Sequence, residues 1–256
     1  MVFNNSDNNT YNFNMYGSPI NLVTEARYLG YQLSTKNDNL SHVLLRKKKA
    51  ISQVAKIKNL GLMSNNLSPQ ARGHLFKSFI RPVILYGIDA SDLSNNEIEI
   101  LQTAEGNALK NCIGINKQVR TKPIMSTLNV EPTVFRILRD KINLFGRLSE
   151  NRLMCNVLNE FNDCFPMNSP SYDMMQFISP NNTPNLDISL NGIFKLAQLK
   201  LNSIVNDTAA MNKLDTHGLE TQDKLKKIFT FYKDKWYIFK IWECIGFSKK
   251  NKYSAG

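Results

Sequence analysis

Apolar residues recur three and four positions apart through most of the chain after residue 40. In residues 41–59 they would fall on one face of an α-helix, and Ser41 stands where a cap residue would begin that helix. Similar stretches are 68–87, 98–114, 131–148, 153–161, 186–205 and 219–245. This spacing predicts a mainly α fold. The stripe of the first helix consists of Val43, Leu44, Ala50, Ile51, Val54 and Ile57.

Strand-like patterns occupy the first 40 residues instead. Residues 11–23 alternate apolar and polar side chains around Gly17, Ser18 and Pro19, which predicts a β-hairpin with a Gly/Pro turn. Residues 27–33 predict one further strand. The helical bundle is therefore expected to follow a short N-terminal β segment.

Residues 68–87 combine an apolar stripe with basic side chains. Ser68 can cap a helix, and Pro69 suits its first position, where the missing N–H costs nothing. Pro82 is expected to kink or end this helix, with residues 83–86 continuing as buried chain. The expected buried stripe consists of Leu75, Phe76, Phe79 and Ile80.

Prolines interrupt an Asn- and Ser-rich stretch at residues 165–185, which predicts a linker. The expected organisation is a β segment at 1–40, a helical domain at 41–164, this linker, and a C-terminal helical segment at 186–256. The last segment ends in a tail that mixes lysines with aromatic residues.

Positive charge is concentrated in two blocks of the chain. The net charge is +11, and residues 41–149 carry 17 basic and 7 acidic side chains, whereas residues 150–223 carry 4 and 9. Residues 224–256 carry 9 and 2. Nucleic acid is the first partner that such blocks indicate and an anionic membrane surface the second, while charge for solubility alone is the alternative. With no apolar run of membrane-spanning length and no secretory signal, an intracellular location in nucleus or cytoplasm is expected.

Motifs of the common enzyme classes are absent. The sequence has no GxxxxGK[ST], GxGxxG, GxSxG or HExxH pattern. Its four cysteines form no CxxC pair, so no metal site and no cofactor are expected. Asp89 with Asp92 and Glu97 with Glu99 are the nearest candidates for a Mg²⁺ pair, but acids at a helix start are better explained by capping. No catalytic residue and no small-molecule substrate is predicted.

Five segments stand out by their order and spacing along the chain. They are RYLGYQLS (Arg27–Ser34), HVLLRKKKA (His42–Ala50), LFKSFIRPVILYG (Leu75–Gly87), LQTAEGNALKNCIG (Leu101–Gly114) and LNVEP (Leu128–Pro132). Together they resemble the reverse transcriptases of non-LTR (LINE-type) retrotransposons, a family of RNA-directed DNA polymerases, in the part that follows the catalytic palm. The resemblance covers roughly residues 11–148.

The resemblance implies a helical, thumb-like bundle behind a short β remnant of a palm. Tyr28, Leu29 and Gly30 would match the end of the palm near the primer grip. The sequence departs from the family because it has no YxDD motif, no adjacent Asp-Asp pair and no Cys/His knuckle. The fingers and most of the palm would lie before Met1, so a truncated or partial polymerase that is inert on its own is expected.

A thumb holds a template–primer duplex by its backbone, which requires positive side chains on a packed helix. In residues 41–58 we expect Arg46, Lys48, Lys49 and Lys56 to project, while Lys47 lays its stem over the core. Residues 68–87 are expected to support the core of the bundle more than to contact nucleic acid. An RNA or DNA duplex is the expected partner, and the candidate contact residues are Arg46, Lys47, Lys48, Lys49, Lys56, Arg72, Lys77 and Arg81.

Other interpretations stay open at this point. The same helices could form a free-standing protein-interaction module, in which the acidic residues 150–223 engage a basic partner. The basic residues of 41–58 could be only a solvated helix face. The tail from Lys224 to Tyr253 could stack bases on Phe229, Tyr232, Trp236 or Tyr237, or form an amphipathic surface for a partner or membrane.

Overall fold

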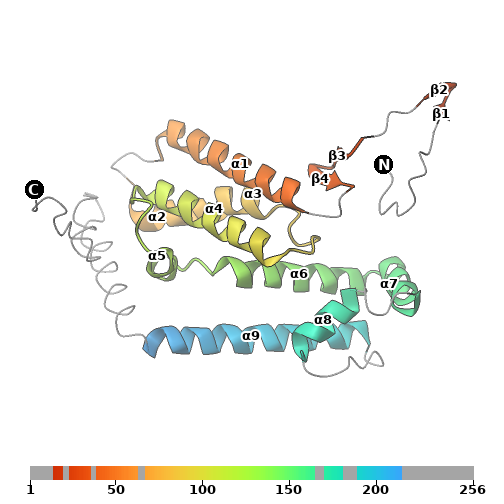
Figure 1. The fold of residues 1–256 in the computed structure, drawn as a ribbon. Helices are drawn as coiled ribbons and strands as arrows, with labels where there is room; N and C mark the ends of the chain where they lie inside the picture. Colours follow the sequence, from red (N-terminus) through yellow and green to blue (C-terminus); the bar gives the residue numbers. More distant parts are fainter. Residues whose placement is uncertain are drawn as a thin grey trace, which may run out of the picture.

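A computed structural model describes residues 14–19, 23–35, 39–62, 67–164, 170–180 and 189–214. The expected mainly helical fold with a short N-terminal β segment is confirmed. Helices α1, α4, α6 and α9 lie in successive layers, with α6 between α4 and α9 (Figure 1). In chain order the elements are β1 (Asn14–Met15), β2 (Ser18–Pro19), β3 (Glu25–Tyr28), β4 (Tyr31–Ser34), α1 (Leu40–Ile57), η1 (Lys58–Leu62), α2 (Pro69–Leu75), η2 (Phe76–Ile80), α3 (Arg81–Leu85), α4 (Asn95–Ile113), α5 (Thr121–Thr127), α6 (Thr133–Glu150), α7 (Arg152–Cys164), α8 (Pro170–Ile178) and α9 (Leu190–Leu214).

Two antiparallel hairpins make up the β structure of the described residues. β1 pairs with β2, so the expected hairpin is present within residues 14–19. Its turn lies at Tyr16 and Gly17, however, and Ser18 and Pro19, which were expected in the turn, form β2. The single strand expected at 27–33 is wrong, because the chain reverses at Leu29 and Gly30 and returns as β4. Both turn residues have positive φ (46° and 83°), which is the backbone conformation of a two-residue type I′ turn.

The first hydrophobic core lies between α1, α3 and α4. As expected, Ser68 caps α2 and accepts a hydrogen bond from the N–H of Ala71 (3.3 Å). Ser94 and Glu97 form a capping box at the start of α4. Short helix α5, which the sequence reasoning missed, contributes Ile124 to the core. The largest fully buried side chains of this first core include Phe76, Ile80, Ile84, Ile88, Leu101, Leu109 and Ile113.

Pro82 was expected to kink or end the helix, and the expected end is wrong because helical residues continue to Leu85. Residues 69–85 are helical throughout, and the turn before the proline is wide, with the N–H of Arg81 donating to Phe76 O five residues back. Such a turn lets the helix pass a proline, which can make no backbone hydrogen bond and needs room for its ring. Two parts of the expected burial are also wrong, since Phe79 is 54% and Tyr86 51% exposed.

A second core joins the C-terminal half of α6 to α7, α8 and α9. It contains Ile142 and Phe145 from α6 together with Met174, Met175 and Ile193. The linker expected at 165–185 is therefore wrong for residues 170–178, which form α8 and bury both methionines. The division between 41–164 and 186–256 is wrong as well, because α9 packs directly on α6. The aromatic tail, 224–253, lies outside the described residues.

Candidate functional site

The turn of the β3–β4 hairpin is held in place by side chains from two helices. Tyr86 donates its hydroxyl to the carbonyl of Leu29 (2.8 Å), and Arg46 donates from Nη2 to the carbonyl of Gly30 (2.5 Å). The Arg46 guanidinium also lies over the Tyr86 ring, 4.5 Å from its centroid. The first three segments that carry the family resemblance thus contact one another in the tertiary structure.

His42 lies at the centre of these contacts and is fully buried. The backbone N–H of Gln32 can only donate, so Nδ1, 3.2 Å away, must accept. A neutral ring then carries its proton on Nε2, which lies 3.0 Å from the carbonyl of Tyr86 and can donate to it. Nε of Arg46 lies 3.2 Å from the same nitrogen. Burial lowers the pKa of His42; the bond to Tyr86 opposes this shift, and the charges of Arg46 and Lys49 add to it.

Acidification from about pH 7.5 to 5.5 is expected to destabilise the protein through His42. Because its pKa is lowered on folding, the unfolded chain binds a proton first as the pH falls through the ordinary value of 6.5. The free energy of unfolding then drops, by at most about 1.4 kcal/mol per pH unit for one group. Urea denaturation across this pH range measures the effect.

The matched variants are His42→Gln and His74→Gln. His42→Gln cannot titrate at this position and should flatten the pH dependence. His74→Gln makes the same replacement at an exposed histidine and serves as the control. Equal slopes for the wild type and His42→Gln would contradict this assignment.

Beside the hairpin, four basic side chains form what we call the basic ridge: Arg27, Lys48, Lys49 and Lys56. Lys48 and Lys56 are exposed and lie on one face of α1, with the exposed Ser52 between them. Lys49 is half-buried at the edge of this face. Arg27, exposed on β3, is near enough that its charge acts on both Arg46 and Lys49.

No acidic side chain of the described residues forms an ion pair with the ridge. Glu25, on the same strand as Arg27, accepts hydrogen bonds from Ser41 and Gln32 instead. The pKa of Lys49 is lowered, first by desolvation and then by the charges of Arg46 and Arg27. A cluster of like charges destabilises the folded chain, and a bound polyanion would relieve that repulsion.

Three predicted contact residues are buried, which corrects the expectation that they reach a nucleic acid. Arg46 and Arg72 are 3% exposed and Arg81 is 6% exposed. Buried polar groups require partners, and each guanidinium donates to a backbone carbonyl elsewhere in the chain. The acceptors are Gly30 O for Arg46, Ile113 O for Arg72 and Glu131 O for Arg81.

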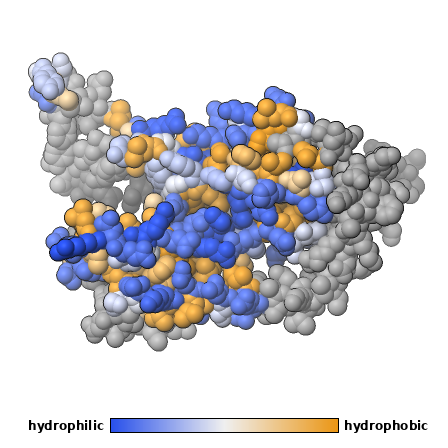
Figure 2. Space-filling view, turned by 180° about the vertical axis from the view of Figure 1, so that it is seen from behind, coloured by the Kyte–Doolittle hydropathy of each residue, from blue (hydrophilic) through white to orange (hydrophobic). Residues whose placement is uncertain are grey.

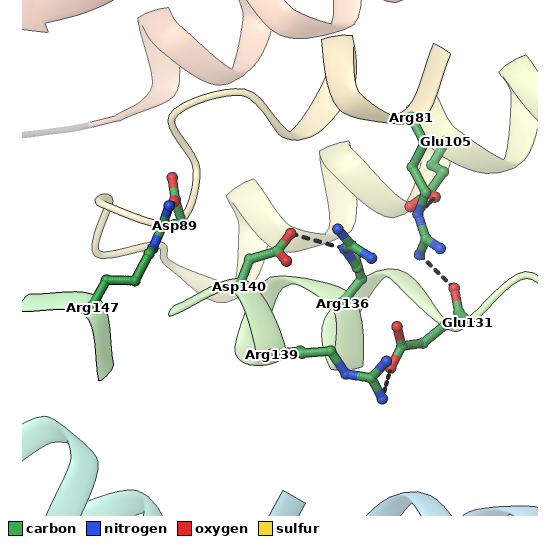
Figure 3. A network of polar contacts seen from close by, with 8 residues as sticks. All are labelled: Arg81, Asp89, Glu105, Glu131, Arg136, Arg139, Asp140 and Arg147. Carbon is green, nitrogen blue, oxygen red and sulfur yellow. Dashed lines mark hydrogen bonds and ion pairs between the residues drawn. The ribbon is translucent and has the colours of Figure 1, made fainter. Parts of the chain in front are cut away.

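Arg81 belongs to a chain of charged groups between α3, α4 and α6. Its Nε lies 2.6 Å from Oε1 of Glu105, which is fully buried. Figure 3 shows Arg81 reaching Glu131 as well, and Arg139 binding the carboxylate of Glu131. Burial raises the pKa of Glu105, and the charge of Arg81 opposes that shift. These charged groups connect helices α3, α4 and α6.

Lys47 and Lys77 also differ from expectation. Lys47 is exposed, and Arg46 takes the position facing the core that was predicted for the Lys47 stem. Lys77 is half-buried, and its Nζ is 3.4 Å from the carbonyl of Leu128. Of the predicted contact residues on α1, only Lys48, Lys49 and Lys56 thus lie on the ridge.

A groove of about 880 Å³ runs between the β3–β4 hairpin, α3 and α6. Tyr28 and Leu29, two of the primer-grip-like residues, stand exposed at its edge, and Gly30 completes the turn behind them. Most charged groups in the groove are already paired, as Arg136 is with Asp140 (2.9 Å). Among the described residues, no group of three His, Cys, Asp or Glu side chains is placed to hold a metal ion.

Sequence reasoning missed Arg27 as part of the site. Arg27 directly precedes the YLGY segment. Recognising a two-residue turn at Leu29 and Gly30 would have placed Arg27 on the first strand of a hairpin. The face of the molecule in Figure 2 is largely hydrophilic, with exposed apolar side chains between the polar ones. No helix in the described part of the chain is long and apolar enough to cross a membrane.

Comparisons with protein-family models, with curated proteins and with solved structures each gave no match. The resemblance to reverse transcriptases therefore depends on the five sequence segments.

Proposed function

We propose that this chain is a non-catalytic part of a non-LTR retrotransposon reverse transcriptase, the end of the palm and the thumb, which holds a nucleic-acid duplex by its backbone. The single observation that supports this most is the basic ridge, a cluster of four cations without an acidic partner among the described residues. The mutual contacts of three resembling segments, through Arg46, Tyr86 and the hairpin turn, agree with the proposal.

The chemistry of the ridge suits phosphates better than bases. Lysine ammonium groups bind phosphate as point charges and release condensed counterions, which gives affinity without sequence preference. Duplexes of different sequence are therefore expected to bind equally well.

Reversing the charge of the ridge tests the proposal. The triple variant Lys48→Glu, Lys49→Glu, Lys56→Glu is expected to bind a short DNA duplex or an RNA–DNA hybrid much more weakly. The slope of log Kobs against log salt should fall in magnitude by about 2 to 3, because each lost phosphate contact removes about 0.9. Fluorescence anisotropy at several salt concentrations measures both quantities.

A matched control separates the ridge from net charge. Lys122→Glu, Lys195→Glu, Lys200→Glu changes the charge equally at exposed positions away from the ridge and should keep most of the affinity and the slope. Equal losses in both triple variants would contradict a localised ridge, and no binding by the wild type would overturn the proposal. Primer extension by the wild-type chain should show no synthesis, since the sequence has no YxDD motif.

A further inference from the structure

Helix α1 exposes a second surface that the basic ridge does not use. Leu40, Leu44 and Ile51 are 36%, 46% and 65% exposed, and their spacing places them on one stripe of the helix. Lys47, and Lys58 at the start of η1, lie exposed along this stripe, on the side away from Lys49 and Lys56. We call these five residues the α1 stripe.

Aligned apolar side chains flanked by lysines are typical of a docking face for an amphipathic, acidic helix. Single exposed apolar side chains are ordinary, but two leucines and an isoleucine on one face form an apolar stripe, which Lys47 interrupts between Leu44 and Ile51. Neither Lys47 nor Lys58 belongs to an ion pair of the described residues. A duplex backbone would gain nothing from the leucines, so this stripe is suited to a protein partner.

Helix α7 of the same chain has the complementary composition. Leu153 is 66% and Val157 48% exposed, and Glu160 follows one turn later on the same stripe. Asp163 is exposed beside it. Neither acid belongs to an ion pair of the described residues. We call these four residues the α7 stripe.

The two stripes belong to different parts of one molecule. α1 lies against α4 in the first core, whereas α7 lies against α6 and α8 in the second. Figure 1 shows α7 at one end of α6, in a layer away from α1. Both stripes remain exposed within one molecule, so each is accessible to a second copy of the chain.

We propose that the chain self-associates head to tail, with the α1 stripe of one molecule docked on the α7 stripe of a second. Apolar contact between leucines, isoleucine and valine supplies the attraction, and the pairing of lysines with Glu160 and Asp163 sets the register. Such a contact is heterologous, so it builds short chains of molecules or a closed ring. The surface and its partner are independent of nucleic-acid binding.

Sedimentation of the full chain, treated with nuclease and free of nucleic acid, tests the proposal. The average mass of the wild type should rise with concentration over about a hundredfold range, as mass action requires, and should fall when salt screens the pairs. A wild type that stays monomeric throughout, or association that disappears after nuclease treatment, would overturn the proposal.

Charge reversal identifies the two stripes. Lys47→Glu with Lys58→Glu, and separately Glu160→Lys with Asp163→Lys, should each weaken self-association about tenfold or more. Mixing the two variants should restore association, because the acidic α1 of one then faces the basic α7 of the other. Lys195→Glu with Lys200→Glu is the control and should associate like the wild type. The proposal fails if the mixture stays monomeric, or if self-association of the control is weakened as much as that of the stripe variants.

Discussion

Replacing Arg81 by methionine is expected to lower the free energy of unfolding by about 3 to 5 kcal/mol. The change leaves the Glu105 carboxylate fully buried without its cation, and it removes the donor to the carbonyl of Glu131. Methionine keeps much of the side-chain volume, so the loss reports charge and hydrogen bonding more than packing. Urea denaturation followed by circular dichroism measures it.

Arg147→Met is the matched control for Arg81→Met. The Arg147 side chain is 69% exposed and lies 3.8 Å from Asp89, so its loss should cost less than about 0.5 kcal/mol. The double variant Arg81→Met, Glu105→Leu removes both buried charges and should recover much of the stability. Similar costs for Arg81→Met and Arg147→Met would contradict the buried pair.

The loss of unfolding free energy caused by Arg81→Met should also depend on pH. Burial already raises the pKa of Glu105, and removing Arg81 takes away the charge that opposes this shift. The folded variant then binds a proton more readily than its unfolded chain, so its stability falls as pH rises. The difference between variant and wild type is expected to shrink from pH 7.5 to pH 5. The contribution of His42 is common to both proteins and cancels.

Gly146→Ala is expected to destabilise the protein by about 1 to 2 kcal/mol, although alanine is the better helix former. A Cβ at this position of α6 would lie 2.6 Å from Cε2 and 2.7 Å from Cζ of Phe194 on α9. One of the two helices must shift, or the phenyl ring must leave its position. Denaturation by urea measures the loss.

The Phe194→Ala background decides whether this contact is the cause. Without the ring there is room for the new methyl group, so Gly146→Ala should then stabilise the protein by up to about 1 kcal/mol. Asn143→Ala, at an exposed position of α6, should be close to neutral in either background. A loss from Gly146→Ala that persists without Phe194 would contradict direct packing of α6 on α9.

Local patterns predicted most of the helices because caps and apolar spacing act over a few residues. The cap at Ser68 is confirmed, and so is the burial of Val43, Ala50, Val54 and Ile57. The burial expected for Leu44 and Ile51 is wrong, because these side chains are 46% and 65% exposed. Helix α8 was missed because prolines and polar residues dominate its surroundings, and only contact with α9 gives its two methionines a place to be buried. The hairpin at Leu29 was missed because a leucine with positive φ is unfavourable by itself and depends on Tyr86 and Arg46 for support.

The candidate site also has parts that the sequence predicts and parts that depend on tertiary contacts. Sequence alone placed Lys48, Lys49 and Lys56 in one basic helix, and these residues form the ridge. It also placed Arg46, Arg72 and Arg81 among the contacts, because an arginine in a sequence has the same charge whether its partner is a phosphate or a carbonyl.

The sequence by itself determined that this chain is mainly helical and that its central part is basic, since both follow from residue order and composition. Only the tertiary structure decided which basic side chains face solvent. Near Arg46, rotation of α1 by one residue exchanges the buried arginine with Lys47. The choice is made by partners that are distant in sequence, the carbonyl of Gly30 in the β3–β4 turn and the ring of Tyr86 just after α3. Burial of a charge is favourable only where such partners exist, and residue order does not reveal them.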